Sequence, residues 1–262
     1  MGAAGGPLME ALGELWSFLT TDDNWWGEHG IANRTWVHVK ISALSLLVAA
    51  LVAGPPAVAF GHLRRGGSAV VGIVNLGRAL PSFGILALVL PLSIQFGFGL
   101  GFWPTVVPLV LLGIPPIFAN TFTGIRSADP GVVEAARGMG LARRQVLAQV
   151  ELPLATPLII TGLRVSAVQI IATATLGALV GLSSLGSFIT EGLARFDNGR
   201  MLTGGLLVAL LAITTEVAFS VTERVLTPWV RVSGGGRSRR QRLRRGDPEP
   251  IPVDEVPNFG PL

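Results

Sequence analysis

Five stretches of this sequence stay apolar for about 20 residues or more, and this pattern limits the possible folds more than any other feature. A helix needs about that length to cross the hydrocarbon core of a bilayer, because each residue adds only about 1.5 Å. The sequence therefore predicts an all-α membrane protein with about five transmembrane helices. The predicted spans are Val37–Phe60, Ala69–Leu92, Trp103–Phe122, Leu154–Val180 and Met201–Leu226.

The composition agrees with a membrane protein, since 50% of the 262 residues are hydrophobic and only 14% are charged. The 34 glycines and 18 prolines do not argue against helical spans, because neighbouring membrane helices satisfy the backbone groups that these residues free. The chain has no cysteine, so disulfides and thiolate metal sites are excluded. The three histidines, none of them in an HExxH motif, are expected near the membrane edges, and we expect no metal site and no catalytic residue.

The arginines predict the orientation of the chain, because short cytoplasmic loops retain positive residues. Thirteen arginines fall on one side of the predicted spans, seven of them after the last span, against three on the other side. The three are Arg34, Arg195 and Arg200. The N-terminus is thus expected outside and the C-terminus in the cytoplasm, and topology explains the formal charge of +4 better than nucleic-acid binding does.

Charged residues inside the predicted spans need a reason, because a charge in hydrocarbon is costly. Arg164 and Arg224 lie near the cytoplasmic ends, where their side chains can reach the interface, and Arg78 lies deeper. Glu216 is the one acid well inside a span, so we expect it to pair with a basic group on another helix, with a transport role as the alternative.

The chain divides into three parts. Residues 1–35 form an extracytoplasmic or interfacial segment, either with a helix from about Leu8 to Leu19 or as a loosely ordered leader. Residues 36–228 form the transmembrane domain. Residues 229–262 form a basic, then proline-rich, cytoplasmic tail that has too little apolar surface to fold alone. Its arginines suit either binding of anionic membrane lipid or simple anchoring.

The longest cytoplasmic connection, residues 126–153, has the pattern of two short helices around a sharp turn. Asp129 suits an N-cap and Pro130 the first helical position. Four residues then recur at helical spacing and predict one apolar face, and Gly138 and Gly140 permit a turn. A second helix is expected from about Arg143 to Val150. The four apolar residues are Val132, Val133, Ala136 and Met139.

This connection resembles the EAA signature of the permease subunits of bacterial ABC importers, with valine at position 150 where isoleucine is usual. The matching residues are Glu134, Ala135, Ala136, Gly140, Val150, Leu152 and Pro153. The resemblance implies the type I importer permease fold. It further implies that the loop is a coupling helix that rests in a groove of a separate ATPase subunit, with the two alanines allowing close approach and Glu134 stabilising the loop.

The strings GIVNLGRALPSFGIL and IATATLGALVGLSSLGSFITEGL narrow the resemblance to the osmoprotectant branch, which imports glycine betaine, choline and carnitine. Arg78 departs from that branch. The implied partners are an ABC ATPase on each coupling loop, a second identical or related permease, and an extracytoplasmic substrate-binding protein. Transport would proceed by alternating access, and the permease itself needs no cofactor. An importer of an amino acid such as methionine and an autonomous channel or secondary transporter are the alternatives.

Polar or helix-breaking residues within the spans are candidates for the translocation pathway, although such residues also hold membrane helices together. The chain has no tyrosine and no aromatic cluster within its predicted spans that could cage a methylated ammonium, so recognition is expected in the separate binding protein. The chain also lacks a phosphate-binding loop, since its one lysine, Lys40, opens the first span. The pathway candidates are Asn75, Pro81, Ser82, Gln169, Thr173 and Thr175.

Overall fold

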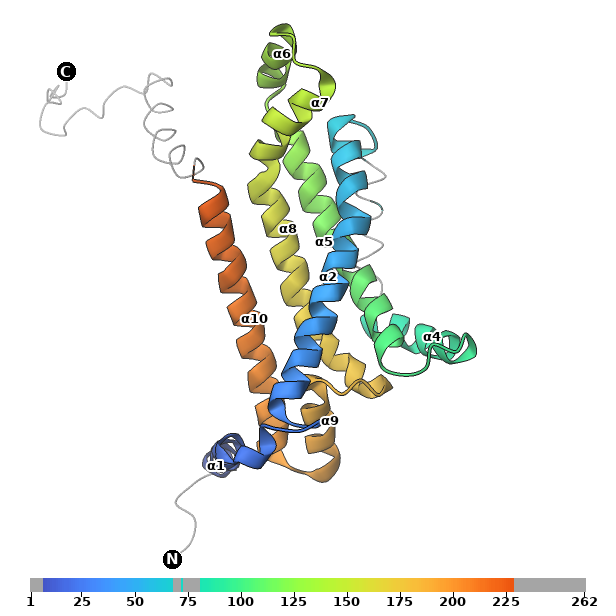
Figure 1. The fold of residues 1–262 in the computed structure, drawn as a ribbon, viewed down its shortest axis with the longest axis vertical. Coiled ribbons are helices and arrows are strands. Elements are labelled where there is room, and N and C mark those ends of the chain that lie inside the picture. Colours follow the sequence, from blue (N-terminus) through green and yellow to red (C-terminus); the bar gives the residue numbers. More distant parts are fainter. Residues whose placement is uncertain (1–6, 68–71, 73–80, 229–262) are drawn as a thin grey trace, which may run out of the picture. The chain divides into compact units, whose positions relative to one another are not determined.

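The computed structural model describes residues 7–67, 72 and 81–228, and the regular elements in these ranges are all helical. The chain separates into a compact unit, Met1–Glu223, and a second unit, Arg224–Leu262. The account below concerns the first unit, whose helices are drawn in Figure 1. Asn75 and Arg78 lie outside the described residues.

In chain order, the bounds of the described helices are α1 Pro7–Thr20, η1 Asp22–Asn24, α2 Ile31–His62, α4 Ser82–Gln95, α5 Phe102–Arg126, α6 Pro130–Gly138, α7 Arg143–Val146, η2 Leu147–Glu151, α8 Leu152–Thr173, η3 Ala174–Val180, α9 Leu185–Arg195 and α10 Asn198–Leu226. Of these, η2 is a π-helical turn, and η1 and η3 are 3-10 helices.

Four of the five predicted spans are confirmed as helices that are long and apolar enough to cross a membrane: Ile31–His62, Phe102–Arg126, Arg143–Val180 and Asn198–Leu226. The second predicted span, Ala69–Leu92, lies partly outside the described residues. Its described part is α4, a 14-residue apolar helix that begins after the extended Pro81 and continues to Gln95.

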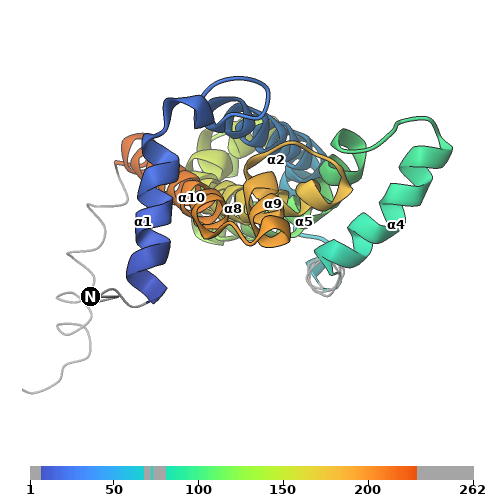
Figure 2. The ribbon, with the colours of Figure 1, turned by 90° about the horizontal axis from the view of Figure 1, so that it is seen from below.

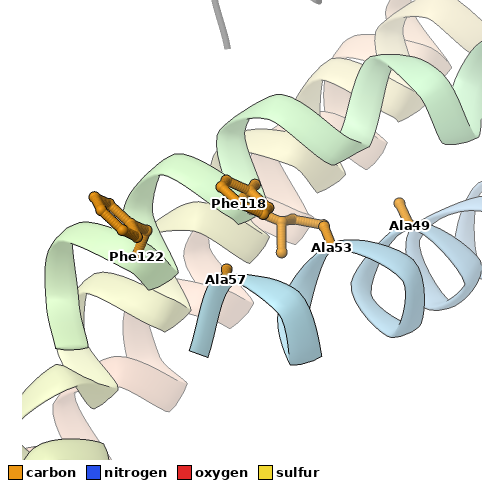
Figure 3. Packing of buried hydrophobic residues seen from close by; sticks show 6 residues of the cluster. Ala49, Ala53, Ala57, Phe118 and Phe122 are labelled. Carbon is orange, nitrogen blue, oxygen red and sulfur yellow. The ribbon is translucent and has the colours of Figure 1, made fainter. Parts of the chain in front are cut away.

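Helices α2, α5 and α8 run side by side and form the centre of the bundle (Figure 1). Figure 3 shows how small residues on one helix meet large ones on the next: Ala49, Ala53 and Ala57 of α2 face Phe118 and Phe122 of α5. The alanines are spaced four residues apart and therefore lie on one face of α2. Small side chains at such a contact let membrane helices approach closely and gain dispersion energy.

The contact between α5 and α8 also depends on small residues. A Cβ atom at Gly162 would lie 2.9 Å from the Cβ of Asn120 and 3.1 Å from the carbonyl oxygen of Pro116. One turn further along α8, the hydroxyl of Ser166 donates to the carbonyl of Gly113 over 2.9 Å. Van der Waals contact and a hydrogen bond between helices are the interactions that hold bundles together in lipid.

Two polar groups on the membrane helices bear on predictions from the sequence. The expected partner of Glu216 is present, because Arg164 on α8 lies 3.5 Å from it. Arg164 also lies 3.5 Å from Glu223. His38, in the second turn of α2, is fully buried among protein side chains, and its Nε2 lies 3.0 Å from the carbonyl oxygen of Ile171.

At the end of the bundle opposite α6, the N-terminal helix α1 lies near α9 and the start of α10 (Figure 2). Phe18 of α1 packs edge-on against Phe188 of α9 with ring centroids 5.9 Å apart. Phe188 belongs to an apolar cluster with Ile31 and Val208, and Phe18 packs against this cluster. The N-terminal segment therefore contains a helix, as one of the two sequence alternatives predicted, and this helix packs on the bundle.

An ion-pair cluster formed by Arg34, Glu191 and Arg200 joins α2, α9 and α10 at this end. Arg34 donates to Glu191 over 2.7 Å, and Arg200 donates to the other carboxylate oxygen over 2.8 Å. Arg34 is only 3% exposed and also lies over the ring of Phe188, 4.4 Å from its centroid. Partial burial alone would raise the pKa of Glu191, but hydrogen bonds and charge attraction from Arg34, then Arg200, lower it overall.

The lowered pKa of Glu191 makes the stability of this end depend on acid pH. Its folded pKa lies below the unfolded value of about 4.3, so the stabilisation is present at neutral pH and is lost as the pH falls through the folded pKa. We expect Glu191→Gln to lower the free energy of unfolding by about 1–3 kcal/mol at neutral pH, because it removes the carboxylate partner of the buried Arg34, whereas Arg200 keeps Asp197 at 3.6 Å. Thermal melts in detergent between about pH 7 and pH 3 measure this effect.

The matched control is Glu10→Gln, on an exposed position of α1. We expect this variant to keep the acid-induced fall in melting temperature of the wild type, whereas Glu191→Gln shows a smaller fall. Parallel pH profiles for the two variants would contradict the assigned role of Glu191.

Candidate functional site

The loop between α5 and α8 begins as the sequence predicts. Asp129 is the N-cap of α6, and its carboxylate accepts a hydrogen bond from the backbone N–H of Gly131 over 2.7 Å. Pro130 occupies the start of the helix, where its missing N–H leaves no hydrogen bond unmade. These two residues fix where α6 starts, directly after the membrane helix α5.

The loop has a small apolar core of its own. Ala128, Val133, Ala136 and Val146 are buried against one another, and Leu141 and Val150 pack on them. These residues come from α6, α7 and the turns beside them, so the two short helices form one packed unit. A segment with its own core moves as a body rather than bending residue by residue.

Gly140 makes the turn that lets α6 fold back on α7. Its φ is +88°, in the left-handed region that disfavours any residue with a Cβ. The N–H of Leu141 reaches back to the carbonyl of Ala136 over 3.2 Å, which is the bond that closes a helix at a left-handed glycine. Gly138, which we expected in the turn, is instead the last residue of α6.

The second short helix continues into the membrane. α7, the π-helical turn η2 and α8 follow without a break, so a single helical segment runs from Arg143 to Val180. Pro153 sits in the first turn of α8, and it has no N–H to donate to the carbonyl four residues earlier. The wider π turn η2 includes Val150 and ends at Glu151, directly before Leu152, the first residue of α8.

Glu151 ties this helix to α2, a contact that the sequence analysis missed. Its side chain is 2% exposed, and its Oε2 lies 2.5 Å from Nδ1 of His62, the last residue of α2. A buried carboxylate needs such a partner, because its desolvation is otherwise costly. The signal in the sequence is an acid at the membrane entrance between two apolar residues, but the partner lies 89 positions away.

The predicted single apolar face of α6 is wrong, because its apolar residues divide between two sides. Val133 and Ala136 face the core of the loop, whereas Val132 is 49% exposed and Met139 is 76% exposed. Ala135 lies three residues after Val132 and is exposed on the same side. We call Val132, Ala135 and Met139 the outer face.

The division also changes the expected roles of the motif residues. Only Ala135 of the two alanines is available for close approach by a partner, since Ala136 is used inside the loop. Glu134 is exposed, and it does not belong to the packed core of the loop.

The described pathway candidates lie at the start of α4, on α8 and on η3. Pro81 is exposed at the start of α4, and Ser82 beside it is half-buried. Gln169 is exposed and Thr173 half-buried; they lie four residues apart and therefore share one side of α8. The hydroxyl of Thr175 donates to the carbonyl of Ala172 over 2.8 Å, which is a local structural bond.

Comparison with known proteins identifies relatives over most of the chain. A family model described as "Binding-protein-dependent transport system inner membrane component" matches residues 45–232. The choline transport system permease protein OpuBB of Bacillus subtilis is 36% identical over 195 residues, which cover 74% of this chain and 88% of that protein. The carnitine transport permease protein OpuCB of Listeria monocytogenes is 34% identical over 200 residues, covering 76% and 89%.

Solved structures with the same fold are also permeases of ABC transporters. A chain of the inward-facing MetNI methionine ABC transporter superposes with a TM-score of 0.64 at 23% identity, over 73% of this chain and 94% of that one. A chain of a bacterial alginate ABC transporter superposes with a TM-score of 0.63 at 16% identity, over 84% and 88%. The chain belongs to the family of binding-protein-dependent transport system inner membrane components, and is a multi-pass permease subunit of an ABC importer.

Proposed function

We propose that this permease imports quaternary-amine osmoprotectants, and that a separate ATPase drives it through the loop of residues 126–153. The observation that carries the coupling role is the division of α6 into two apolar sides. One side is locked into the loop core, and the outer face of Val132, Ala135 and Met139 is exposed. An exposed apolar surface at a loop tip favours a protein partner.

Contacts within the loop give it the stiffness that coupling needs. A force on α6 passes through Val133 and Ala136 to Val146, and from there along the continuous helix into α8. The contact between Glu151 and His62 connects the same movement to α2. Rigid-body motion of packed helices is the usual way in which a small displacement at one site opens another.

ATP would be hydrolysed by the partner. A nucleotide-binding loop requires a glycine-rich turn that ends in lysine and serine or threonine, and the one lysine, Lys40, lies in the membrane helix α2. We assign no cofactor and no catalytic residue to this subunit. Two copies of the ATPase would dock on the loops of two permeases.

The proposed orientation places the loop in the cytoplasm. The C-terminal end of α2 and the α6–α7 loop share one end of the bundle (Figure 1), and this end carries Arg64, Arg65, Arg137 and Arg143. Arg34 and Arg200 lie at the other end, in the Glu191 cluster. The excess of positive residues marks the cytoplasmic side, so the N-terminal helix α1 would face the outside.

A second permease, identical or related, would cover the exposed side of α8. Val165, Gln169 and Ala172 are exposed and spaced along one face of this membrane helix. An amide that faced lipid would lack hydrogen-bond partners, which is costly in hydrocarbon. Gln169 and Thr173 therefore suit a protein interface or a polar passage between two permeases, and Ser82 and Pro81 of α4 stay candidates for the same passage.

The substrate class rests on the relatives, several of which are named as choline, carnitine or glycine betaine permeases. The methylated ammonium would be recognised by an extracytoplasmic binding protein, which would deliver it to this subunit. The same machine with an amino acid as cargo is the second candidate, since the solved structures of this fold include a methionine transporter. An autonomous channel is the alternative from a different class.

Reconstitution tests the proposal. Vesicles that contain this permease with its ATPase, any partner permease and its binding protein are supplied with radiolabelled glycine betaine, choline, carnitine or methionine. We expect uptake of at least one quaternary amine that requires internal ATP. Uptake of methionine alone would favour the amino-acid alternative, and flux without ATP would contradict the importer mechanism.

The turn at Gly140 gives a first mutational prediction. Gly140→Val places a β-branched residue at a φ of +88° and should misplace α6, so ATP-dependent uptake should fall at least about tenfold. Gly138→Val is the matched control, because Gly138 is helical and a Cβ there meets no atom within 4 Å. The measurement is ATP-dependent uptake by both variants in the vesicle assay. Equal losses of uptake in the two variants would contradict a specific role of the Gly140 turn.

The outer face gives a second mutational prediction. Val132→Asp and Met139→Asp should each lower the amount of ATPase that copurifies with the permease by about tenfold, because each puts a charge into an apolar contact. The melting temperature of the permease alone should change little, since both side chains are exposed. Ala142→Asp is the control and should keep the ATPase bound, because Ala142 is exposed and occupies the N-cap position of α7, where aspartate is favoured.

A further inference from the structure

A cavity lined by four arginines lies between the end of α2 and the coupling loop. Its volume is about 380 Å³, and its lining residues come from the end of α2 and the turn after it and from α6 and α7. We call it the basic cavity. The described residues that line it are His62, Leu63, Arg64, Arg65, Arg137 and Arg143.

The charge of the basic cavity is not balanced by the residues around it. None of its six described lining residues is acidic. Glu151, which contacts His62, is buried and does not line the cavity. Among the described residues, no acid forms an ion pair with Arg65, Arg137 or Arg143. At the other end of the bundle, by contrast, Glu191 pairs with both Arg34 and Arg200. Arginines gathered without an acid create a strong positive potential that attracts an anion.

The backbone that presents these arginines is held in a defined shape. Arg64 donates from Nη2 to the carbonyl of Ala128 over 3.1 Å, so the turn after α2 is fastened to the loop. Arg64 itself has a φ of +51°, a left-handed conformation that favours glycine. The N–H of Arg65 reaches back to the carbonyl of Phe60 over 3.3 Å and closes α2. The cavity wall is thus a fixed turn, with an arginine where glycine would be less strained.

The position of the cavity matches the depth of lipid headgroups. His62 is the last residue of the membrane helix α2, and Leu63 beside it is 52% exposed. Arg143 begins the helical segment that continues into α8 at Leu152, roughly 14 Å further along at 1.5 Å per residue. The cavity therefore extends from the membrane edge to about that distance beyond it, the layer that contains phospholipid phosphates.

We propose that the basic cavity binds the headgroup phosphate of an anionic membrane phospholipid. Guanidinium groups pair with phosphate oxygens through two parallel hydrogen bonds, and basic pockets between membrane helices at the cytoplasmic surface suit such headgroups. Because the site joins the end of α2 to α6 and α7, a bound headgroup would stabilise the contact between the coupling loop and the bundle. The site is separate from the outer face of α6, so lipid and ATPase would bind together.

Binding of phosphatidylglycerol to the purified full-length chain tests this assignment. Native mass spectrometry measures the fraction of protein that retains dioleoylphosphatidylglycerol during a titration, with dioleoylphosphatidylcholine as the zwitterionic reference. We expect Arg65→Gln combined with Arg143→Gln to weaken phosphatidylglycerol binding about 30-fold, roughly fivefold for each charge, and to leave phosphatidylcholine binding unchanged.

The control pair is Arg144→Gln with Arg195→Gln, which removes the same charge from exposed positions that do not line the cavity. It should keep phosphatidylglycerol affinity within about threefold of the wild type. Equal weakening by both pairs would overturn the assigned site. If the double variant fails to fold, the single variants Arg143→Gln and Arg144→Gln make the same comparison, with a fivefold loss expected for the first alone.

Two further arms separate the lipid from other anions. Inorganic phosphate at millimolar concentration should not displace phosphatidylglycerol, because a free ion lacks the acyl chains that hold the headgroup at the membrane edge. Full displacement by phosphate would overturn the lipid assignment. A cavity variant that retains phosphatidylglycerol but no longer copurifies with the ATPase would also overturn the lipid assignment, because the arginines would then form a protein contact.

Discussion

The close approach of α2, α5 and α8 is the constraint on which the rest of the structure depends. Lipid gives helices no hydrophobic reason to associate, so small residues must let the backbones meet. Ala49, Ala53 and Ala57 of α2 do this toward α5, and Gly162 of α8 does it toward α5 from the other side. Because the helices touch along their length, a shift of one moves the others, and the loop at their end can act on the whole bundle.

The loop of residues 126–153 is rigid at the place where force would enter under the proposed mechanism. Its short helices have too few residues to be stable alone, so the core of Val133, Ala136 and Val146 and the turn at Gly140 hold them together. Continuity of helix from Arg143 into α8 then removes any hinge between loop and membrane. The π turn η2 ends directly before α8, so the helix continues through the position where Pro153 lacks an N–H.

Local patterns predicted the parts of the fold that neighbouring residues decide. Four spans, the N-cap at Asp129 and the turn at Gly140 follow from nearby residues, and the structure agrees with each. Pairs distant in the sequence were mostly missed: Glu191 meets Arg34 across 157 positions, and spacing on one helix cannot reveal such a partner. The two sides of α6 were missed for a related reason, because periodicity marks apolar residues without showing which of them the loop core uses.

The arginines illustrate why counting charges predicts topology better than it predicts structure. At one end Arg34 and Arg200 share Glu191, so two of the three arginines predicted outside are balanced by an acid. At the other end Arg65, Arg137 and Arg143 gather around a cavity without an acidic lining residue among those described. A count of arginines along the sequence shows only that one side of the membrane has more of them than the other. The structure distinguishes arginines that pair with an acid between helices from arginines without an acidic partner. The second group is available to bind an anion from the surrounding membrane.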